Sequence, residues 1–315
     1  MTPPWVHPRL SADSPAEHDG HKAIDINDLD RITVIGVGLL GGSAGLALRA
    51  SRPEIVRVGL GRRRSALQRA LRHDAVDEIT LSYTRGLRGT RAVILATPIS
   101  HFASILEQIA PHLEPGTVVT DVGSTKAEVV RLAERTLPKH AHFVGSHPVA
   151  GSEKTGVEYA RADLFDGAAC FVTPTRRSQP DAVELVTELW TSFGSRVMRL
   201  SPARHDQVLA RVSHLPHAVA SVLIAMNHDL LDAAGTGLMD TTRIASGDPQ
   251  LWRDIFASNR TETIRAIDQF EKRIRQFRHI LAREDDAGVE KLLAASKRGR
   301  DAWIAGKLAR KEMPS

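Results

Sequence analysis

The sequence predicts an α/β protein in which a doubly wound parallel sheet is followed by an all-helical domain. Between Arg31 and about residue 200, short runs rich in valine and isoleucine alternate with helical stretches. Strands that are apolar throughout are typical of a parallel sheet with helices on both faces. Beyond residue 200 the chain shows helical periodicity and no strand pattern.

The predicted strands and helices alternate in order along the first two thirds of the chain. Strands are expected in ITVIGVG, IVRVGL, RAVILATP, TVVTDVG, HFVGSHP, CFVTP and SRVMRL. Helices are expected near residues 39–49, 65–72, 100–112 and 127–135. We place the sheet domain at residues 30–200 and the helical domain at residues 201–315, since long chains divide into more than one core.

Composition and charge restrict the classes of partner and ligand that this protein is expected to bind. Hydrophobic residues make up 42% and charged residues 25% of the chain, and no apolar run approaches the roughly 20 residues of a membrane span. We expect a cytoplasmic protein with no membrane partner. Residues 1–29 are predicted to form a flexible acidic tail, which leaves the basic charge on the body of the chain. A basic body suits phosphates and carboxylates, whereas 4% aromatic residues argue against nucleic acid.

A glycine-rich turn lies between the first predicted strand and the first predicted helix. Its glycines follow the pattern G-x-G-x-x-G, which allows a tight turn and a close approach of a pyrophosphate to the helix N-terminus. The placement is typical of a Rossmann-like dinucleotide-binding domain; a glycine turn without a ligand is the alternative. The candidate cofactor-binding residues here are Gly36, Gly38, Leu39, Leu40 and Gly41.

Three arginines indicate which dinucleotide is bound. An NAD-binding unit places a carboxylate about twenty residues after the glycines, where it binds the ribose 2′-hydroxyl. Here Gly61 occupies that position, and Arg62, Arg63 and Arg64 follow. Guanidinium groups hold a 2′-phosphate that a carboxylate would repel, so we predict NADP rather than NAD as the cofactor. The alternative is that the arginines form a solvated helix face.

Two later strands end in candidate site residues. Thr97 and Pro98 end one strand at the sheet edge where ligands of open α/β sheets bind, although a plain turn would look similar. After the next strand, Thr125 and Glu128 fit a capping box that leaves the hydroxyl of Ser124 free to face a cleft.

His147 follows a strand in the glycine-rich segment GSHPVAGSEK, which we interpret as an exposed loop. Histidine is the usual general base near neutral pH, although a single histidine is more often structural. His214 and His217 are three residues apart on one predicted helix face, but no third ligand is evident, so no metal is expected and a cleft position or a buried hydrogen bond is favoured. The single cysteine, Cys170, is predicted to be a buried reduced thiol.

Five segments together resemble one enzyme family. GVGLLGGS, DVGSTK, GSHPVAGSEKTGVEYA, VSHLPHAVA and TTRIASGDPQLWRDIFASN, in this order and spacing, are similar to the prephenate and arogenate dehydrogenases of tyrosine biosynthesis. The resemblance implies an NAD(P)-binding domain joined to a helical domain that forms a homodimer. The implied reaction passes hydride from ring C4 to the nicotinamide, releases CO2 and leaves tyrosine or 4-hydroxyphenylpyruvate as the aromatic product.

The resemblance also implies roles for single residues. His147 is similar to the catalytic histidine that takes the ring hydroxyl proton, and Ser124 to a serine of the same hydrogen-bond network. Arg243 matches an arginine that binds the substrate carboxylate. The other substrate-binding residues implied are Ser213, His214, His217, Trp252 and Glu153. Without the resemblance, a surface ion pair of Arg243 with Asp240 or Asp248 and a core position for Trp252 would be favoured.

The sequence alone leaves two other functional classes to consider. A β-hydroxyacid dehydrogenase or imine reductase also joins a dinucleotide domain to helices, but the GSHPVAG segment argues against it. A non-catalytic NADP sensor would have no need for both His147 and Arg243. The choice between prephenate and arogenate is open, and NADP preference favours arogenate or both.

Overall fold

The computed structural model describes residues 26–151 and 154–312. Most of the predicted acidic tail, residues 1–25, lies outside these residues. The last part of the predicted tail is packed, because Ile26 in the short helix η1 (Ile26–Asp28) and Leu29 are each only 3% exposed and belong to the core. The packed structure therefore begins before Arg31.

The first sheet is parallel and has the strand order β3-β2-β1-β4-β5-β6. The order reverses between β1 and β4, which is the Rossmann-type switch point where open α/β sheets bind ligands. This confirms the predicted fold class. The strands are β1 (Arg31–Ile35), β2 (Val56–Leu60), β3 (Glu78–Thr80), β4 (Ala92–Leu95), β5 (Val118–Asp121) and β6 (His142–Phe143).

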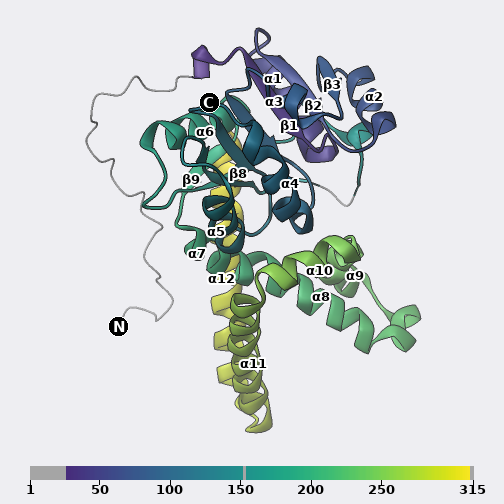
Figure 1. The fold of residues 1–315 in the computed structure, drawn as a ribbon. Helices are drawn as coiled ribbons and strands as arrows, with labels where there is room; N and C mark the ends of the chain where they lie inside the picture. The colour runs from purple at the N-terminus through teal and green to yellow at the C-terminus, as the bar shows by residue number, and fades with distance from the viewer. Residues whose placement is uncertain (1–25, 152–153, 313–315) are drawn as a thin grey trace.

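Helices cover both faces of this sheet (Figure 1). Alternate side chains of β1 divide between two cores: Ile32 and Val34 pack with α1 and α6, whereas Ile35 packs with α4 and α5. Burial on both faces explains why the strands are apolar throughout. The helices of this part are α1 (Leu39–Ser51), α2 (Arg64–Arg72), α3 (Tyr83–Leu87), α4 (Phe102–Ile109), α5 (Ala127–Thr136) and α6 (Pro180–Ser192), with 3-10 turns η2 (Ile99–His101), η3 (Ala110–His112) and η4 (Val157–Tyr159).

A second, three-stranded sheet departs from the prediction. The segment HFVGSHP forms two strands rather than one: β6 ends the parallel sheet, and β7 (Gly145–Pro148) pairs antiparallel with β8 (Ala169–Thr173). The last strand, β9 (Arg196–Arg199), pairs parallel with β8. The change of sheet follows Val144, because the N–H of Val144 still donates to the carbonyl of Val119 in β5, whereas the N–H of Ser146, two residues later, donates to the side chain of Asp121.

The chain after residue 200 is helical, as predicted. Figure 1 shows α11 extending away from the sheets with α12 packed alongside it. The elements are α7 (Pro202–Leu209), the π-helical turn η5 (Ala210–His214), α8 (Leu215–Met226), η6 (His228–Ala233), α9 (Thr236–Thr242), η7 (Arg243–Ser246), α10 (Pro249–Ser258), α11 (Arg260–Ala282) and α12 (Asp286–Glu312).

One helical stretch of the described residues, Pro202–Met226, is long and apolar enough to cross a membrane by length and composition alone. Its most apolar window has a mean hydropathy of 1.4. The same stretch carries the buried polar side chains of His205, Asp206 and His214, which hydrogen-bond to other parts of the protein. Such contacts are typical of a helix packed within a protein.

Candidate active site

The glycine turn lies where three strand ends meet. Gly36 has a φ of +94°, and its backbone N–H donates a 3.0 Å hydrogen bond to the carbonyl of Leu60 at the end of β2. A Cβ at this position would come within 2.6 Å of the methyl group of Thr97, which follows β4. Only glycine combines this backbone conformation with such a close approach.

The start of α1 is open toward the position of a ligand. Gly38 precedes the helix, has no side-chain cap, and a Cβ built on it meets no atom within 4 Å. Gly41 packs so closely on the carbonyl of Gly36 that a side chain would not fit. Leu39 and Leu40 form the first half-buried residues of the helix. The arrangement leaves free N–H groups and open space in front of them.

An orphaned polar atom lies beside this turn. The hydroxyl oxygen of Thr97 is buried and has no hydrogen-bond partner among the described residues. A buried hydroxyl is normally hydrogen-bonded, so a ligand that supplies a partner fits this position. Pro98 follows as an exposed residue. The glycine cradle and the free hydroxyl together fit a dinucleotide.

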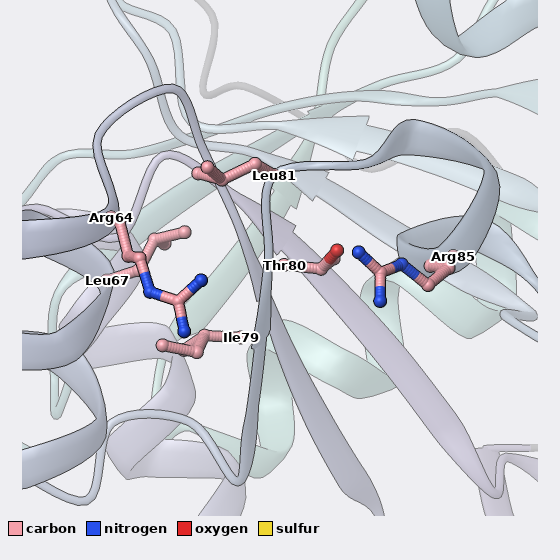
Figure 2. Close-up of a pocket in the computed structure, with 6 residues that line it drawn as sticks. All are labelled: Arg64, Leu67, Ile79, Thr80, Leu81 and Arg85. Carbon is pink, nitrogen blue, oxygen red and sulfur yellow. The ribbon is translucent and has the colours of Figure 1, made fainter.

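The three arginines are exposed, and the side chains of Arg62 and Arg64 reach different neighbours. Arg62 extends from the end of β2 to the turn after β4, where its guanidinium lies 3.3 Å from Nε2 of His101. Arg63 precedes α2 with an extended backbone. Arg64 lines a hollow of about 210 Å³ at the end of β3, which Arg85 approaches from the other side of Thr80 (Figure 2).

Gly61 joins these residues to the sheet edge. Its backbone N–H lies 3.4 Å from the carbonyl of Thr80, so the ends of β2 and β3 are adjacent. A Cβ at Gly61 would make only ordinary contact with Leu67. Sterics therefore do not require glycine here, and the missing carboxylate is the feature that distinguishes the position.

The predicted capping box at the start of α5 is wrong. The hydroxyl of Thr125 lies 2.9 Å from that of Ser258 in α10 and does not cap the helix. The carboxylate of Asp206 caps it instead, accepting 2.8 Å hydrogen bonds from the backbone N–H groups of Lys126 and Ala127. Ser124 is half-buried, and its hydroxyl has no hydrogen bond to any residue that the structure describes.

Asp121 holds together the two segments that carry Ser124 and His147. Its carboxylate pairs with the fully buried amine of Lys126 and accepts hydrogen bonds from the backbone N–H groups of Gly123 and Ser146. Ser124 follows Gly123, and His147 follows Ser146. The buried ion pair therefore brings both candidate residues to the same edge of the sheets.

His147 lies in strand β7 and not in the exposed loop predicted for it. His147 is only 7% exposed, because β7 pairs antiparallel with β8 and the ring of His147 packs edge-on against that of His205, with centroids 5.1 Å apart. Burial lowers the pKa of His147 well below its usual value, and the neighbouring His205, Lys126 and His214 lower this pKa further. His147 is therefore neutral at physiological pH, the state that a base requires.

Two residues that the sequence did not indicate lie beside His147. Nδ1 of His147 is 2.9 Å from Nε2 of His205, and Nδ1 of His205 is 2.8 Å from a carboxylate oxygen of Asp206. Both residues come from α7, 58 positions or more along the chain. Their only sequence signal is an adjacent histidine and aspartate in a helix, which is not specific.

His214 forms a buried hydrogen bond, one of the two possibilities that its spacing left open. Its Nδ1 lies 3.2 Å from the amide nitrogen of Asn259, and the same amide donates to the backbone carbonyl of Asp206. Burial lowers the pKa of His214 to about 4. The residue is 1% exposed, so it supports the helices around Asp206 from inside.

His217 and Trp252 form a stacked pair. Their ring centroids are 3.5 Å apart and the ring planes differ by 11°. Nδ1 of His217 is buried without a hydrogen-bond partner among the described residues, and burial lowers the pKa of this histidine. A buried, unpaired ring nitrogen next to an aromatic face is suited to a polar ring substrate.

The remaining candidates are more exposed. Arg243 begins η7, which packs on α8, and its side chain is exposed and forms no ion pair with another described residue. Asp248, one predicted partner, instead caps α10. Ser213 is half-buried in the π-helical turn η5. Glu153 lies outside the described residues.

Contacts between α10 and the strand ends join the helical part to the sheet edge. Besides the contact of Ser258 with Thr125, α10 packs against η2, next to the turn that carries Thr97. The stacked Trp252 is in the same helix. The helix thus links the cofactor side of the site to His217.

Comparison with known families covers most of the chain. The family model described as the nucleotide-binding domain of prephenate dehydrogenase matches residues 44–199, and the model of its dimerization domain matches residues 201–295. Among curated proteins, the prephenate dehydrogenase of Bacillus subtilis is 34% identical over 86% of this chain and 76% of its own length. The cyclohexadienyl dehydrogenase of Zymomonas mobilis is 30% identical over 81% of this chain and 89% of its own length.

Solved structures agree with the family match. Prephenate dehydrogenase from A. aeolicus, in complex with hydroxyphenyl propionate and NAD+, superimposes with a TM-score of 0.83 and 34% identity, covering 87% of this chain and 98% of that one. Synechocystis arogenate dehydrogenase gives a TM-score of 0.77 and 28% identity, covering 87% and 99%. The chain belongs to the prephenate dehydrogenase family of NAD(P)-dependent oxidoreductases.

Proposed function

We propose that this protein oxidises and decarboxylates arogenate, prephenate or both, with NADP as the preferred cofactor. The observation that carries the proposal is the buried, neutral His147, which a shared carboxylate holds at the same sheet edge as Ser124, whose hydroxyl bonds to no described residue. A base and a hydrogen-bonding hydroxyl are the two groups that oxidation of a ring alcohol needs.

The reaction is an oxidation followed by loss of a carboxylate. When bound, a nicotinamide cofactor supplies the acceptor for the hydride that leaves ring C4. Nε2 of His147 takes the proton of the C4 hydroxyl as the C=O bond forms, and Ser124 holds the same oxygen. The bond from C1 to the carboxylate then breaks, its electron pair enters the ring, and the oxygen is protonated to give a phenol and CO2. Aromatisation makes this step strongly favourable.

The residues that would hold the cofactor surround the glycine turn. Gly36, Gly38 and Gly41, with Leu39 and Leu40, admit the pyrophosphate at the start of α1, and the hydroxyl of Thr97 finds its missing partner there. The match to a nucleotide-binding domain and the NAD+ complex of the A. aeolicus enzyme support NAD(P) binding.

NADP preference rests on charge at the end of β2. Gly61 offers no carboxylate to repel a 2′-phosphate, and Arg62 and Arg63 are exposed beside it. Arg64 points into the hollow that it shares with Arg85, so a phosphate there would lie between two guanidinium groups on either side of Thr80 (Figure 2). Guanidinium groups bind phosphate oxygens with charge-assisted hydrogen bonds.

The substrate would lie between the sheet edge and the helices. Arg243, which forms no ion pair with another described residue, is a cation suited to the side-chain carboxylate. Nδ1 of His217, which has no hydrogen-bond partner among the described residues, lies beside the face of Trp252. Ser213 is a further proposed substrate-binding residue, Glu153 is proposed on the family resemblance alone, and His214 supports the pocket from inside. Both prephenate and arogenate carry the carboxylates that Arg243 would bind, which supports use of either.

We also propose that the protein is a cytoplasmic homodimer joined through its helices, on the basis of the match to a dimerization domain. Large apolar side chains exposed on these helices support an interface. They include Val212, Val222, Met226, Leu230, Met239, Ile264, Ile274, Leu281 and Leu293. Exposed apolar surface on this scale is typical of protein interfaces.

The proposed function is tested by four initial rates. Absorbance at 340 nm is followed with prephenate or arogenate, each with NADP or NAD. We expect turnover with NADP and at least one substrate. No rate in any of the four, with NADP binding retained, would overturn the proposed reaction while leaving the cofactor site intact. Equal kcat/KM for NADP and NAD would overturn the cofactor preference alone.

A further inference from the structure

A chain of three buried side chains begins at His147. The ring of His147 is 7% exposed, that of His205 is fully buried, and Asp206 is 2% exposed. Nδ1 of His147 lies 2.9 Å from Nε2 of His205, and Nδ1 of His205 lies 2.8 Å from the carboxylate of Asp206. The three side chains therefore form one continuous line of hydrogen bonds from His147 through His205 to Asp206.

The carboxylate at the end of the chain determines where each proton lies. Asp206 accepts hydrogen bonds from two backbone N–H groups at the start of α5, a position that stabilises a negative charge. An ionised carboxylate only accepts, so Nδ1 of His205 carries a proton. Nε2 of a neutral His205 then accepts, and Nδ1 of His147 must donate to it. Nε2 of His147 is left without a proton.

The residues around His205 keep its ring neutral and fixed in place, so that the direction of each hydrogen bond is retained. Burial is the largest of the effects that lower the pKa of His205, and the lowered pKa keeps the ring neutral. The amine of Lys126 is nearby, but it pairs with Asp121 and does not compete for Asp206. The ring of Phe171, opposite His147 in the strand pair, packs edge-on against His205 with centroids 5.4 Å apart. His205 is thus held by contacts on both sides.

We propose that His205 and Asp206 are positioning residues that hold His147 in the tautomer with its proton on Nδ1, so that Nε2 is the free base. The proposal rests on the proposed function in that His147 takes the substrate proton. Once Nε2 is protonated, the positive charge on His147 is stabilised through His205 by the carboxylate of Asp206. A base whose second nitrogen is oriented in this way needs no rearrangement before it reacts.

The tautomer can be observed directly, without substrate or cofactor. Protein labelled with 15N in its histidines is studied by long-range 1H–15N correlation, and the His147 signals are assigned by their loss in His147→Asn. We expect the Nδ1–H pattern in the wild type and in His205→Gln, whose amide oxygen also accepts. In His205→Leu, which lacks an acceptor, the Nε2–H pattern should appear. An Nε2–H tautomer in the wild type, or no change in His205→Leu, would overturn the proposal.

Kinetics provide the second readout. We expect kcat of His205→Leu to fall by about 10²-fold or more and that of His205→Gln to stay within about tenfold of the wild type, with KM little changed in both. Ser201→Ala is the matched control, because the hydroxyl of Ser201 caps the same helix α7 by accepting from the N–H of Arg204 and is not bonded to either histidine, and the change leaves the backbone carbonyl of Ser201 in place. Its kcat should equal that of the wild type, whereas an equal loss in this variant would mean that His205 acts only through the stability of α7.

The two hypotheses fail in different ways. An active wild type whose rate survives in His205→Leu would overturn the positioning role and leave the proposed function intact. An inactive wild type would overturn the proposed function, while the tautomer measurement still decides the arrangement of protons. Circular dichroism at the assay temperature checks that each variant is folded. If His205→Leu does not fold, the wild-type tautomer alone decides.

Discussion

The carboxylate of Asp206, in α7, accepts a 2.8 Å hydrogen bond from the backbone N–H of Lys126, at the start of α5. The same carboxylate accepts the next N–H, that of Ala127, and so caps a helix of the sheet domain from the first helix of the helical region. The two parts of the chain are therefore joined by a buried polar contact in addition to apolar packing.

Removing the cap should destabilise the protein. Asp206→Ala leaves two backbone N–H groups and the ring of His205 without an acceptor, so we expect the free energy of unfolding to fall by about 2–4 kcal/mol. Urea unfolding followed by circular dichroism measures this change. Glu128→Ala is the control, because the predicted capping box does not form; a loss as large in this variant would contradict the assignment of the cap.

His147→Asn should lower kcat by on the order of 10²–10⁴ with KM little changed, because asparagine cannot take up the substrate proton. Steady-state kinetics with NADP and the better substrate provide the measurement. His142→Asn is the control, since His142 is half-buried in the neighbouring strand β6 but lies outside the site. Near-normal turnover in His147→Asn would remove this histidine from the role of base.

Stability should fall in mild acid because of buried histidines. The pKa of His214 is lowered to about 4 in the folded protein, so between pH 6.5 and 4 the unfolded chain binds a proton that the folded chain does not. This contribution is complete above pH 6.5 and is lost as the pH falls toward 4. For His214 alone the loss between pH 7 and pH 5 is on the order of 2 kcal/mol.

The contribution of His214 is measured by comparison. Urea unfolding at pH 7 and pH 5 gives the pH-dependent loss for the wild type and for His214→Gln, and the loss should be smaller in the variant. His228→Gln is the matched control, because the side chain of His228 is 82% exposed. An equal loss in the wild type and in His214→Gln would mean that His214 titrates normally in the folded state.

The arginines after β2 should determine cofactor choice. We expect Arg62→Ala and Arg63→Ala each to lower kcat/KM for NADP by about tenfold or more, as one charge-assisted hydrogen bond is lost, and to change kcat/KM for NAD little. Arg72→Ala, at the other end of α2, is the control and should affect neither cofactor. Parallel losses with NADP and NAD would show that the arginines do not recognise the 2′-phosphate.

Local patterns predicted the parts of this structure that local chemistry determines. Gly36 and Gly41 could be identified because the turn's backbone conformation and close packing exclude other residues. The parallel sheet could be predicted because burial on both faces makes its strands apolar. The short edge strand β3 was missed, since its three residues are partly exposed and carry no apolar run.

Long-range contacts explain what the sequence did not indicate. The pattern of Thr125 and Glu128 fits a capping box, but Asp206, 80 residues away, binds the helix start instead. His147 was expected in a loop because its glycine-rich flanks resemble one, and only the pairing with β8 makes the segment a buried strand. The partner His205 has no local signal at all, because its role depends on where α7 packs.

The central claim is that this protein couples oxidation of the ring to loss of CO2, and one measurement tests it most directly. Purified enzyme is incubated with NADP and arogenate or prephenate, and NADPH, CO2 and the phenolic product are quantified in the same sample. We predict that the three products form in equal amounts and that none forms without NADP. Formation of NADPH without CO2 would contradict the claim and indicate oxidation of a hydroxyl group with the carboxylate retained.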